Sequence, residues 1–143
     1  MPLRIGVDVL SIERIRMATE RRGERFLQRA FTVNEVRECL SSSNPYPCLA
    51  GKFAAKEAVY KALQRAPVSG LRWREIEILT EEERPNVKLN GKMAEDSFKK
   101  GIGEICVSIT HDMRSGTAIA VALAEHPEDR NLGLSIGKRG GVY

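Results

Sequence analysis

Three residues in this chain have types and a spacing that could do chemistry. Asp8 interrupts an otherwise apolar or small run at residues 5–10, and Glu57 stands in an alanine-rich stretch with Lys61 four residues after it. Residues four apart lie on one face of a helix, so Lys61 would lie beside Glu57. Mg²⁺ takes one or two protein carboxylates and fills its other positions with water and phosphate oxygens. The pattern therefore indicates a magnesium site at which Lys61 holds a phosphate.

Each of these residues also has an ordinary structural explanation. An acid at the end of a strand can face water or cap the helix that follows, which would account for Asp8. Glu57 and Lys61 could form a surface ion pair worth only about 0.3 kcal/mol. His111 follows a predicted strand and could be a simple turn residue. Position alone leaves both interpretations open.

The common phosphate-binding and nucleophile motifs are absent. The chain has no GxxxxGK[ST] loop, no serine nucleophile elbow, and its only glycine cluster lies near the C-terminus. These absences argue against nucleotide hydrolysis of the P-loop kind. Lys52 and Lys56 lie on the same predicted helix as Lys61, but Lys56 points elsewhere, and we expect it to be solvated or in an ion pair.

Composition favours one soluble globular domain. The chain has 143 residues, of which 42% are hydrophobic and 29% charged, and these values are typical of such domains. No run approaches the roughly 18 apolar residues of a membrane span. The first apolar run contains Asp8, so we do not expect a signal peptide. A cytoplasmic protein without a membrane segment is predicted.

The three cysteines show no CxxC spacing. Their odd number and irregular placement give little support to a disulfide framework or a zinc site, and they favour a reducing cytosol. Free cysteine behaves as a small apolar residue. We therefore expect Cys39, Cys48 and Cys106 to pack in the core.

The net charge of +4 is unevenly distributed. Residues 1–75 carry 14 Lys and Arg against 8 Asp and Glu, whereas residues 76–143 carry 9 against 11. A basic half attracts polyanions or an acidic protein. A non-catalytic RNA-binding module is therefore an alternative function, although the chain has no basic run with interleaved aromatic residues.

The hydrophobic periodicity predicts an α+β domain in which a small antiparallel sheet packs against a long helix. Ser11 is placed to cap the first helix, Gly23 to end it, and Thr32 with Glu35 has the spacing of a capping box. We expect the segment from residue 126 onward to be a loose tail. Strands are predicted at 5–10, 75–79, 87–89, 105–110 and 117–123, and helices at 12–22, 24–30, 48–64 and 91–100. A further short helix is predicted to start at 32–35, with a loop at 41–47 and a turn at 111–116.

Four segments together resemble the holo-acyl-carrier-protein synthase family of phosphopantetheinyl transferases. They are IGVDVLSIERI at 5–15, GKFAAKEAVYKAL at 51–63, ERPNVKLNG at 83–91 and VSITHD at 107–112. Their order and separations agree with the family over about residues 3–125, so residues 1–125 would form the transferase domain. A larger, two-domain type of transferase is disfavoured, because 143 residues hold one copy of the motifs.

The resemblance implies a reaction and the residues that carry it. A carrier-protein serine would attack the β-phosphate of coenzyme A and release adenosine 3′,5′-bisphosphate. Asp8 and Glu57 would bind Mg²⁺ across the pyrophosphate, and Lys61 would contact the transferring phosphate. The coenzyme A pocket would be lined by Lys52, Pro85 and His111.

The resemblance also implies partners. The family forms trimers with each site between neighbouring subunits. Arg14, Met17 and Arg21 follow i, i+3, i+7 spacing, so they would share one helix face. This face matches the patch that receives an acidic carrier-protein helix, formed by Arg14, Met17, Arg21, Arg25 and Phe26.

Two segments depart from the family pattern. QRAPVSG at 64–70 has glycine only at its end, where family members often have a glycine-rich stretch, and the loop at 41–47 lacks the basic residues that members often carry. Both places lie near the adenosine and 3′-phosphate end of coenzyme A in the family. The departures therefore concern how the nucleotide is held, not the metal chemistry.

Overall fold

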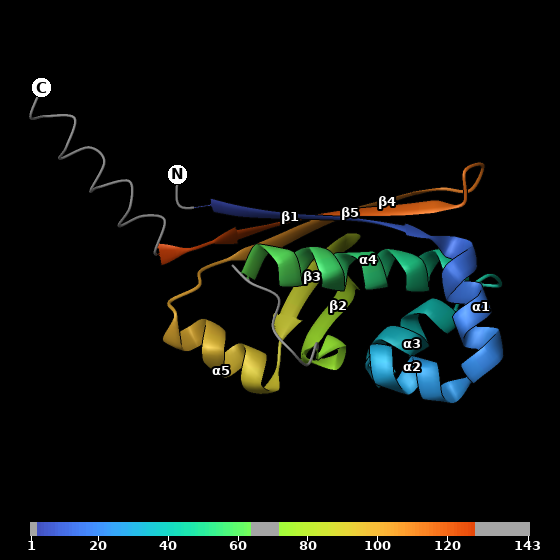
Figure 1. Ribbon diagram of the computed structural model, residues 1–143, viewed down its shortest axis with the longest axis horizontal. Coiled ribbons are helices and arrows are strands. Elements are labelled where there is room, and N and C mark those ends of the chain that lie inside the picture. Colours follow the sequence, from blue (N-terminus) through green and yellow to red (C-terminus); the bar gives the residue numbers. More distant parts are fainter. Residues whose placement is uncertain (1–2, 64–71, 128–143) are drawn as a thin grey trace, which may run out of the picture.

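The structure is a computed structural model that describes residues 3–63 and 72–127. Its elements follow the predicted order, with small shifts at their ends (Figure 1). The strands are β1 (Leu3–Ser11), β2 (Ile76–Glu81), β3 (Arg84–Leu89), β4 (Ile105–Asp112) and β5 (Thr117–Glu125); the helices are α1 (Ile12–Arg22), α2 (Glu24–Ala30), α3 (Val33–Leu40), α4 (Tyr46–Leu63), the short 3₁₀ helix η1 (Trp73–Glu75) and α5 (Gly91–Lys99).

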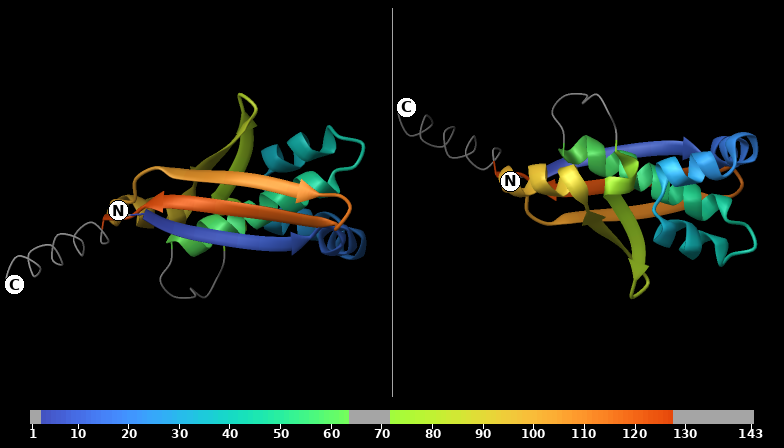
Figure 2. Two further views of the ribbon diagram at one scale, coloured as in Figure 1. Left: turned by 90° about the horizontal axis from the view of Figure 1, so that it is seen from above. Right: turned by 90° about the horizontal axis from the view of Figure 1, so that it is seen from below.

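The predicted α+β class is confirmed, but the strands form two sheets, not one. A three-stranded antiparallel sheet has the order β1-β5-β4, and β2 pairs with β3 in a separate hairpin. Helix α4 packs against the inner face of the large sheet and against β2 (Figure 1). Seen from above, β1 and β4 form the two edges of the large sheet, and the hairpin projects beyond the β4 edge (Figure 2). Helix α4 is therefore the centre of the fold.

Small residues allow α4 to lie unusually close to the sheet. The helix presents buried alanines, among them Ala58 and Ala62, to a row of buried alanines on β5. At Gly6 on β1, an added Cβ would lie 1.8 Å from the carbonyl oxygen of Ala58. No side chain fits at that distance, so glycine is required where β1 crosses the helix.

The outer face of the large sheet carries the larger apolar side chains. Strand β5 alternates strictly, with alanines facing α4 and branched residues facing outward. The outward side chains are between 38% and 64% exposed. Together they form a contiguous apolar surface on a single chain. They are Leu3, Ile5, Val7 and Val9 on β1 and Ile119, Val121 and Leu123 on β5.

Helices α1–α3 pack at the N-terminal end of α4 around a second apolar cluster that contains Ile15, Phe31 and Leu49. The predicted capping box is present: the Glu35 amide donates to the Thr32 hydroxyl at 3.2 Å, and the Thr32 amide donates to the Glu35 carboxylate at 2.8 Å. Ser11 does stand at the N-cap of α1, but its side chain makes no capping hydrogen bond.

The expectation for the cysteines was wrong in two respects. Cys39 and Cys48 form a disulfide that joins the end of α3 to the start of α4, with their Cα atoms 5.4 Å apart. A loop of this length lets the two helix ends meet, and no CxxC spacing is needed. Cys39 is in the core as expected, but Cys106 is an exposed free thiol, because its position on β4 faces outward.

Several predicted boundaries shift. Helix α4 begins at Tyr46 and is described to Leu63, so its predicted end beyond that residue lies outside the described residues. Strand β4 continues to Asp112, which places His111 in the strand opposite Ala118 and not in the turn. His126, the first residue of the expected tail, is buried, and residues 128–143 lie outside the described part. No described helix is long and apolar enough to cross a membrane.

Candidate functional site

Asp8 and Lys61 meet at the β1 edge of the large sheet. Even-numbered residues of β1 face α4, so Asp8 points toward the helix. The Lys61 ammonium donates to Asp8 Oδ1 at 3.1 Å and to the Val7 carbonyl at 3.0 Å. The Lys61 side chain is 51% exposed and that of Asp8 18%, so a ligand can reach both from solvent.

Glu57 lies one helical turn before Lys61, and the structure gives it a partner that the sequence did not indicate. The indole nitrogen of Trp73 donates to Glu57 Oε1 at 3.1 Å, and the Trp73 ring packs on Phe53 at 5.3 Å between centroids. The surface ion pair that offered an ordinary explanation of Glu57 and Lys61 is not formed, because Lys61 pairs with Asp8 on β1 instead.

The donor set fits a magnesium ion. Asp8 and Glu57 are hard carboxylates, and Mg²⁺ binds through one or two such groups while substrate phosphates and water complete its coordination. Within the described residues, no group of three or more potential protein ligands gathers at one point. The pair would therefore leave most coordination positions to water and phosphate, as a site that takes a diphosphate requires.

Lys52, Pro85 and His111 lie together in a pocket of about 200 Å³. They come from three different elements, α4, β3 and β4, which are joined here only by the tertiary fold. The predicted coenzyme A residues are thus neighbours in space. The other lining residues are Glu38, Pro47, Cys48, Gly51, Ile78, Thr80, Glu83 and Ile109.

The pocket and the Asp8 cluster lie on opposite sides of α4. Lys52 and Lys61 are nine positions apart, which corresponds to a half turn around the helix and about 14 Å along it. Lys61 contacts β1, whereas Lys52 contacts β2, and these strands flank α4 from different sides (Figure 2). The residues predicted to bind one coenzyme A molecule are therefore divided into two groups within one chain.

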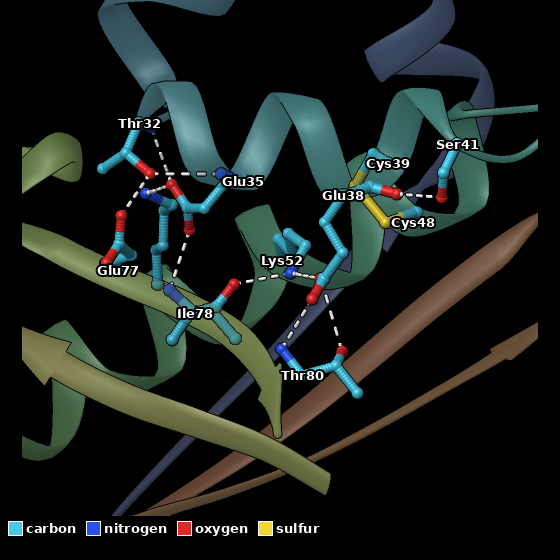
Figure 3. A network of polar contacts seen from close by, with 11 residues as sticks. Thr32, Glu35, Glu38, Cys39, Ser41, Cys48, Lys52, Glu77, Ile78 and Thr80 are labelled. Atoms are coloured by element: carbon cyan, nitrogen blue, oxygen red, sulfur yellow. Dashed lines mark hydrogen bonds and ion pairs between the residues drawn. A yellow bond between two sulfur atoms is a disulfide. The ribbon is translucent and has the colours of Figure 1, made fainter. Parts of the chain in front are cut away.

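A network of buried and partly buried ion pairs lies on the pocket side of α4 (Figure 3). Lys52 pairs with Glu38 and donates to the Ile78 carbonyl at 2.5 Å. Lys56 is fully buried, pairs with Glu35 at 2.6 Å and donates to two backbone carbonyls. Burial lowers the pKa of Lys56, and the carboxylate of Glu35 opposes that shift. Of the two environments expected for Lys56, solvent or an ion pair, the structure shows the ion pair.

The predicted carrier-protein patch lies on α1 and α2. Arg14, Arg21 and Arg25 are exposed, and none of them forms an ion pair with a described residue. Arg16, in contrast, is held by Glu13 and Glu20 on the same helix. Met17 is 37% exposed, while Phe26 is partly buried against Phe31 and Phe53. Three unpaired arginines thus border a small apolar area.

The sequence analysis missed Trp73, Glu38 and Thr80. Trp73 orients a predicted metal ligand, and Glu38 pairs with a predicted coenzyme A residue. Thr80 binds both oxygens of Glu38, through its amide at 2.8 Å and its hydroxyl at 3.3 Å. Each contact joins residues 14 or more positions apart. No local spacing in the sequence indicates such pairs. The one available signal is Trp73 itself, because an indole nitrogen that is buried usually has a hydrogen-bond acceptor.

Comparisons with known proteins show which family the chain resembles. Residues 4–122 match the model of the 4′-phosphopantetheinyl transferase superfamily. The chain is 42% identical over 119 residues to a holo-acyl-carrier-protein synthase of Chlamydia caviae, covering 83% of this chain and 95% of that protein. It is 42% identical to the corresponding protein of Chlorobaculum tepidum, covering 83% and 97%.

Solved structures show the same similarity. The holo-acyl-carrier-protein synthase of Neisseria meningitidis superposes with a TM-score of 0.76 at 28% identity, covering 85% of this chain and 97% of that one. The Helicobacter pylori protein, solved in complex with coenzyme A, superposes with a TM-score of 0.69 at 35% identity, covering 82% and 96%.

Proposed function

Because the chain belongs to the holo-acyl-carrier-protein synthase family of the 4′-phosphopantetheinyl transferase superfamily, we propose that it transfers 4′-phosphopantetheine from coenzyme A to a serine of an apo acyl carrier protein. The products would be holo carrier protein and adenosine 3′,5′-bisphosphate. The observation that carries this proposal is that the motif residues gather into two groups, one on each side of α4. Membership in a transferase family replaces the alternative of a non-catalytic RNA-binding module.

The metal site is proposed at Asp8 and Glu57. Bound Mg²⁺ would neutralise charge on the pyrophosphate, and such electrostatic stabilisation provides most of the catalysis in phosphoryl transfer. Asp8 and Glu57 would hold the ion from β1 and α4, and Trp73 would fix the direction of the Glu57 carboxylate. Lys61 already reaches Asp8 and would turn its ammonium to the transferring phosphate. No protein nucleophile is needed, because the carrier serine attacks.

The direct test is a transfer assay. The protein is incubated with coenzyme A, Mg²⁺ and apo carrier protein, and the carrier is analysed by mass spectrometry. We expect the mass increment of one phosphopantetheine, with loss of transfer in excess chelator. A carrier mass that does not change under any of these conditions would contradict the proposal.

We further propose that the protein is a homotrimer with each site between two subunits. Asp8, Glu57 and Lys61 lie at the β1 edge and Lys52, Pro85 and His111 at the β4 edge, so a ring of copies would bring one group against the other. The exposed apolar outer face of the large sheet supplies a surface that association would bury.

Mixed oligomers test this arrangement. Asp8→Asn damages one group and His111→Ala the other, so each variant alone should be nearly inactive. Co-expressed, the two should regain about a quarter of the activity, because random mixing gives that fraction of interfaces with both groups intact. Two copies of Asp8→Asn carrying different tags are the control and should regain nothing. A fully active monomer in analytical ultracentrifugation would contradict the trimer.

The carrier protein is proposed to bind Arg14, Met17, Arg21, Arg25 and Phe26. These arginines have no partner among the described residues, and an acidic helix would supply one. The transferase domain is proposed to comprise residues 1–125. The substrates also lead us to propose a cytoplasmic location, where a bond such as Cys39–Cys48 is uncommon.

A further inference from the structure

The coenzyme A pocket on the β4 side of α4 carries an acidic residue that the reaction does not require. Glu38 projects from α3 into the pocket that contains Lys52 and His111. Its carboxylate pairs with the Lys52 ammonium (Figure 3). Lys52 is the only lysine or arginine among the lining residues, so the one full positive charge of this pocket is already neutralised.

Glu38 is held firmly in this position. Thr80 donates to both of its oxygens, from its amide at 2.8 Å and from its hydroxyl at 3.3 Å. The next residue, Cys39, is bound to Cys48 at the pocket wall, which fixes the end of α3 against the start of α4. Burial raises the pKa of Glu38, but hydrogen bonds from Lys52 and Thr80 outweigh it and lower the pKa overall. The carboxylate is therefore charged at neutral pH and cannot simply swing away.

Lys52 does not depend on Glu38 for its place. Its side chain is 5% exposed, and its ammonium donates to the Ile78 carbonyl at 2.5 Å. The main effect of Glu38 on a ligand is consequently its charge. Glu83 adds a second carboxylate to the lining, so the pocket as a whole is not positive.

The proposed function indicates which phosphate of coenzyme A would bind in this pocket. Coenzyme A carries a pyrophosphate and one phosphate on the 3′ position of its ribose. The pyrophosphate is assigned to Asp8, Glu57 and Lys61 on the other side of α4. The remaining anionic group is the 3′-phosphate, and Lys52 is the cation left to bind it.

We propose that Glu38 is a specificity-determining residue that neutralises Lys52, so that the 3′-phosphate adds little to recognition and 3′-dephospho-coenzyme A is also a good substrate. This inference rests on the proposed function and deepens it. A phosphate near the Lys52–Glu38 pair meets an attraction and a repulsion of similar size, and the two largely cancel.

The test compares coenzyme A with 3′-dephospho-coenzyme A as donors to the same carrier protein. We expect the wild-type ratio of kcat/KM for the two donors to lie below about ten, because the pocket charge is balanced. Glu38→Gln keeps the size and removes the charge, and its single amide oxygen can still accept the hydrogen bond from the Thr80 amide. It should raise this ratio at least about fivefold, since Lys52 then attracts the 3′-phosphate unopposed.

Two further variants keep the test decisive. Glu95→Gln on α5, a helix that contributes no residue to the lining of this pocket, removes the same charge and should leave the ratio unchanged. Glu83→Gln should raise the ratio in the same direction as Glu38→Gln if the latter variant is too unstable to assay. A wild-type ratio above about ten, or no rise in either pocket variant, overturns the inference. Transfer from neither donor would instead refute the proposed function.

Discussion

The two sides of helix α4 use the same residue types for different purposes. On the β1 side, Lys61 is half exposed and its partner Asp8 is reachable from solvent. On the β2 side, Lys56 is fully buried and each of its hydrogen bonds goes to the protein itself. The difference teaches that exposure, and not residue type, decides which lysine of this helix a ligand can reach, since both Lys56 and Lys61 are paired with carboxylates. Lys52 is intermediate, because it lines a pocket but is paired with Glu38.

Removing a lysine from each side should produce the largest contrast in stability. Lys56→Met leaves Glu35 as an unpaired buried charge and should lower the free energy of unfolding by about 3–5 kcal/mol. Lys61→Met should cost at most about 1 kcal/mol, because exposed ion pairs contribute little. Urea denaturation followed by circular dichroism measures both.

A second substitution checks the cause. In Lys56→Met/Glu35→Gln no charge is buried, so at least about 1 kcal/mol should return relative to Lys56→Met alone. If the double variant is no more stable than the single one, the loss comes from packing and the ion pair has no special role.

Substitutions on the β1 side of α4 should have the largest effect on activity. Asp8→Asn and Glu57→Gln each remove a hard ligand, and we expect transfer to fall about 100-fold or more while the fold is retained. The measurement is the initial rate of phosphopantetheine transfer at saturating Mg²⁺. Full activity in either variant would show that the β1 side of α4 is not the metal site.

The smallest expected effect concerns the carrier-protein patch, which lies apart from both sides of α4. Arg14→Glu/Arg21→Glu should weaken carrier binding about tenfold, because repulsion replaces attraction in the encounter. Affinity for coenzyme A should be unchanged, and added salt should weaken the wild-type carrier interaction. Lys99→Glu/Lys100→Glu on and just after α5 is the matched control. The measurement is a titration of each variant with carrier protein and with coenzyme A. If coenzyme A binding fell while carrier binding persisted, the assignment of Arg14 and Arg21 to the carrier would be wrong.

The sequence contained most of the local structure. The capping box at Thr32 and the glycines at positions 23 and 101 mark helix ends, because these residues act through contacts within a few positions. Asp8, Glu57 and Lys61 could be named because they stand in recognisable motifs. The contact between Lys61 and Asp8 could not be predicted in this way, because it depends on where β1 crosses α4.

Long-range pairings were not predictable in the same way. Glu35 and Lys56 are 21 positions apart, and nothing in either neighbourhood selects the other. The Cys39–Cys48 bond was missed because a spacing of nine does not match a known framework. The sequence also did not determine which face of β5 packs against α4. Alanine alternates there with larger apolar residues, and either set is compatible with a core.

That alternation has a thermodynamic consequence. The inward alanines of β5 contribute little apolar area to the folding of one chain, while the larger residues Ile119, Val121 and Leu123 remain partly in contact with water. In the proposed trimer, much of the hydrophobic free energy available to this sheet would be gained on association and not on folding. Stability would then depend on mass action, so the midpoint of thermal unfolding should rise with protein concentration, and dilution alone should destabilise the subunit.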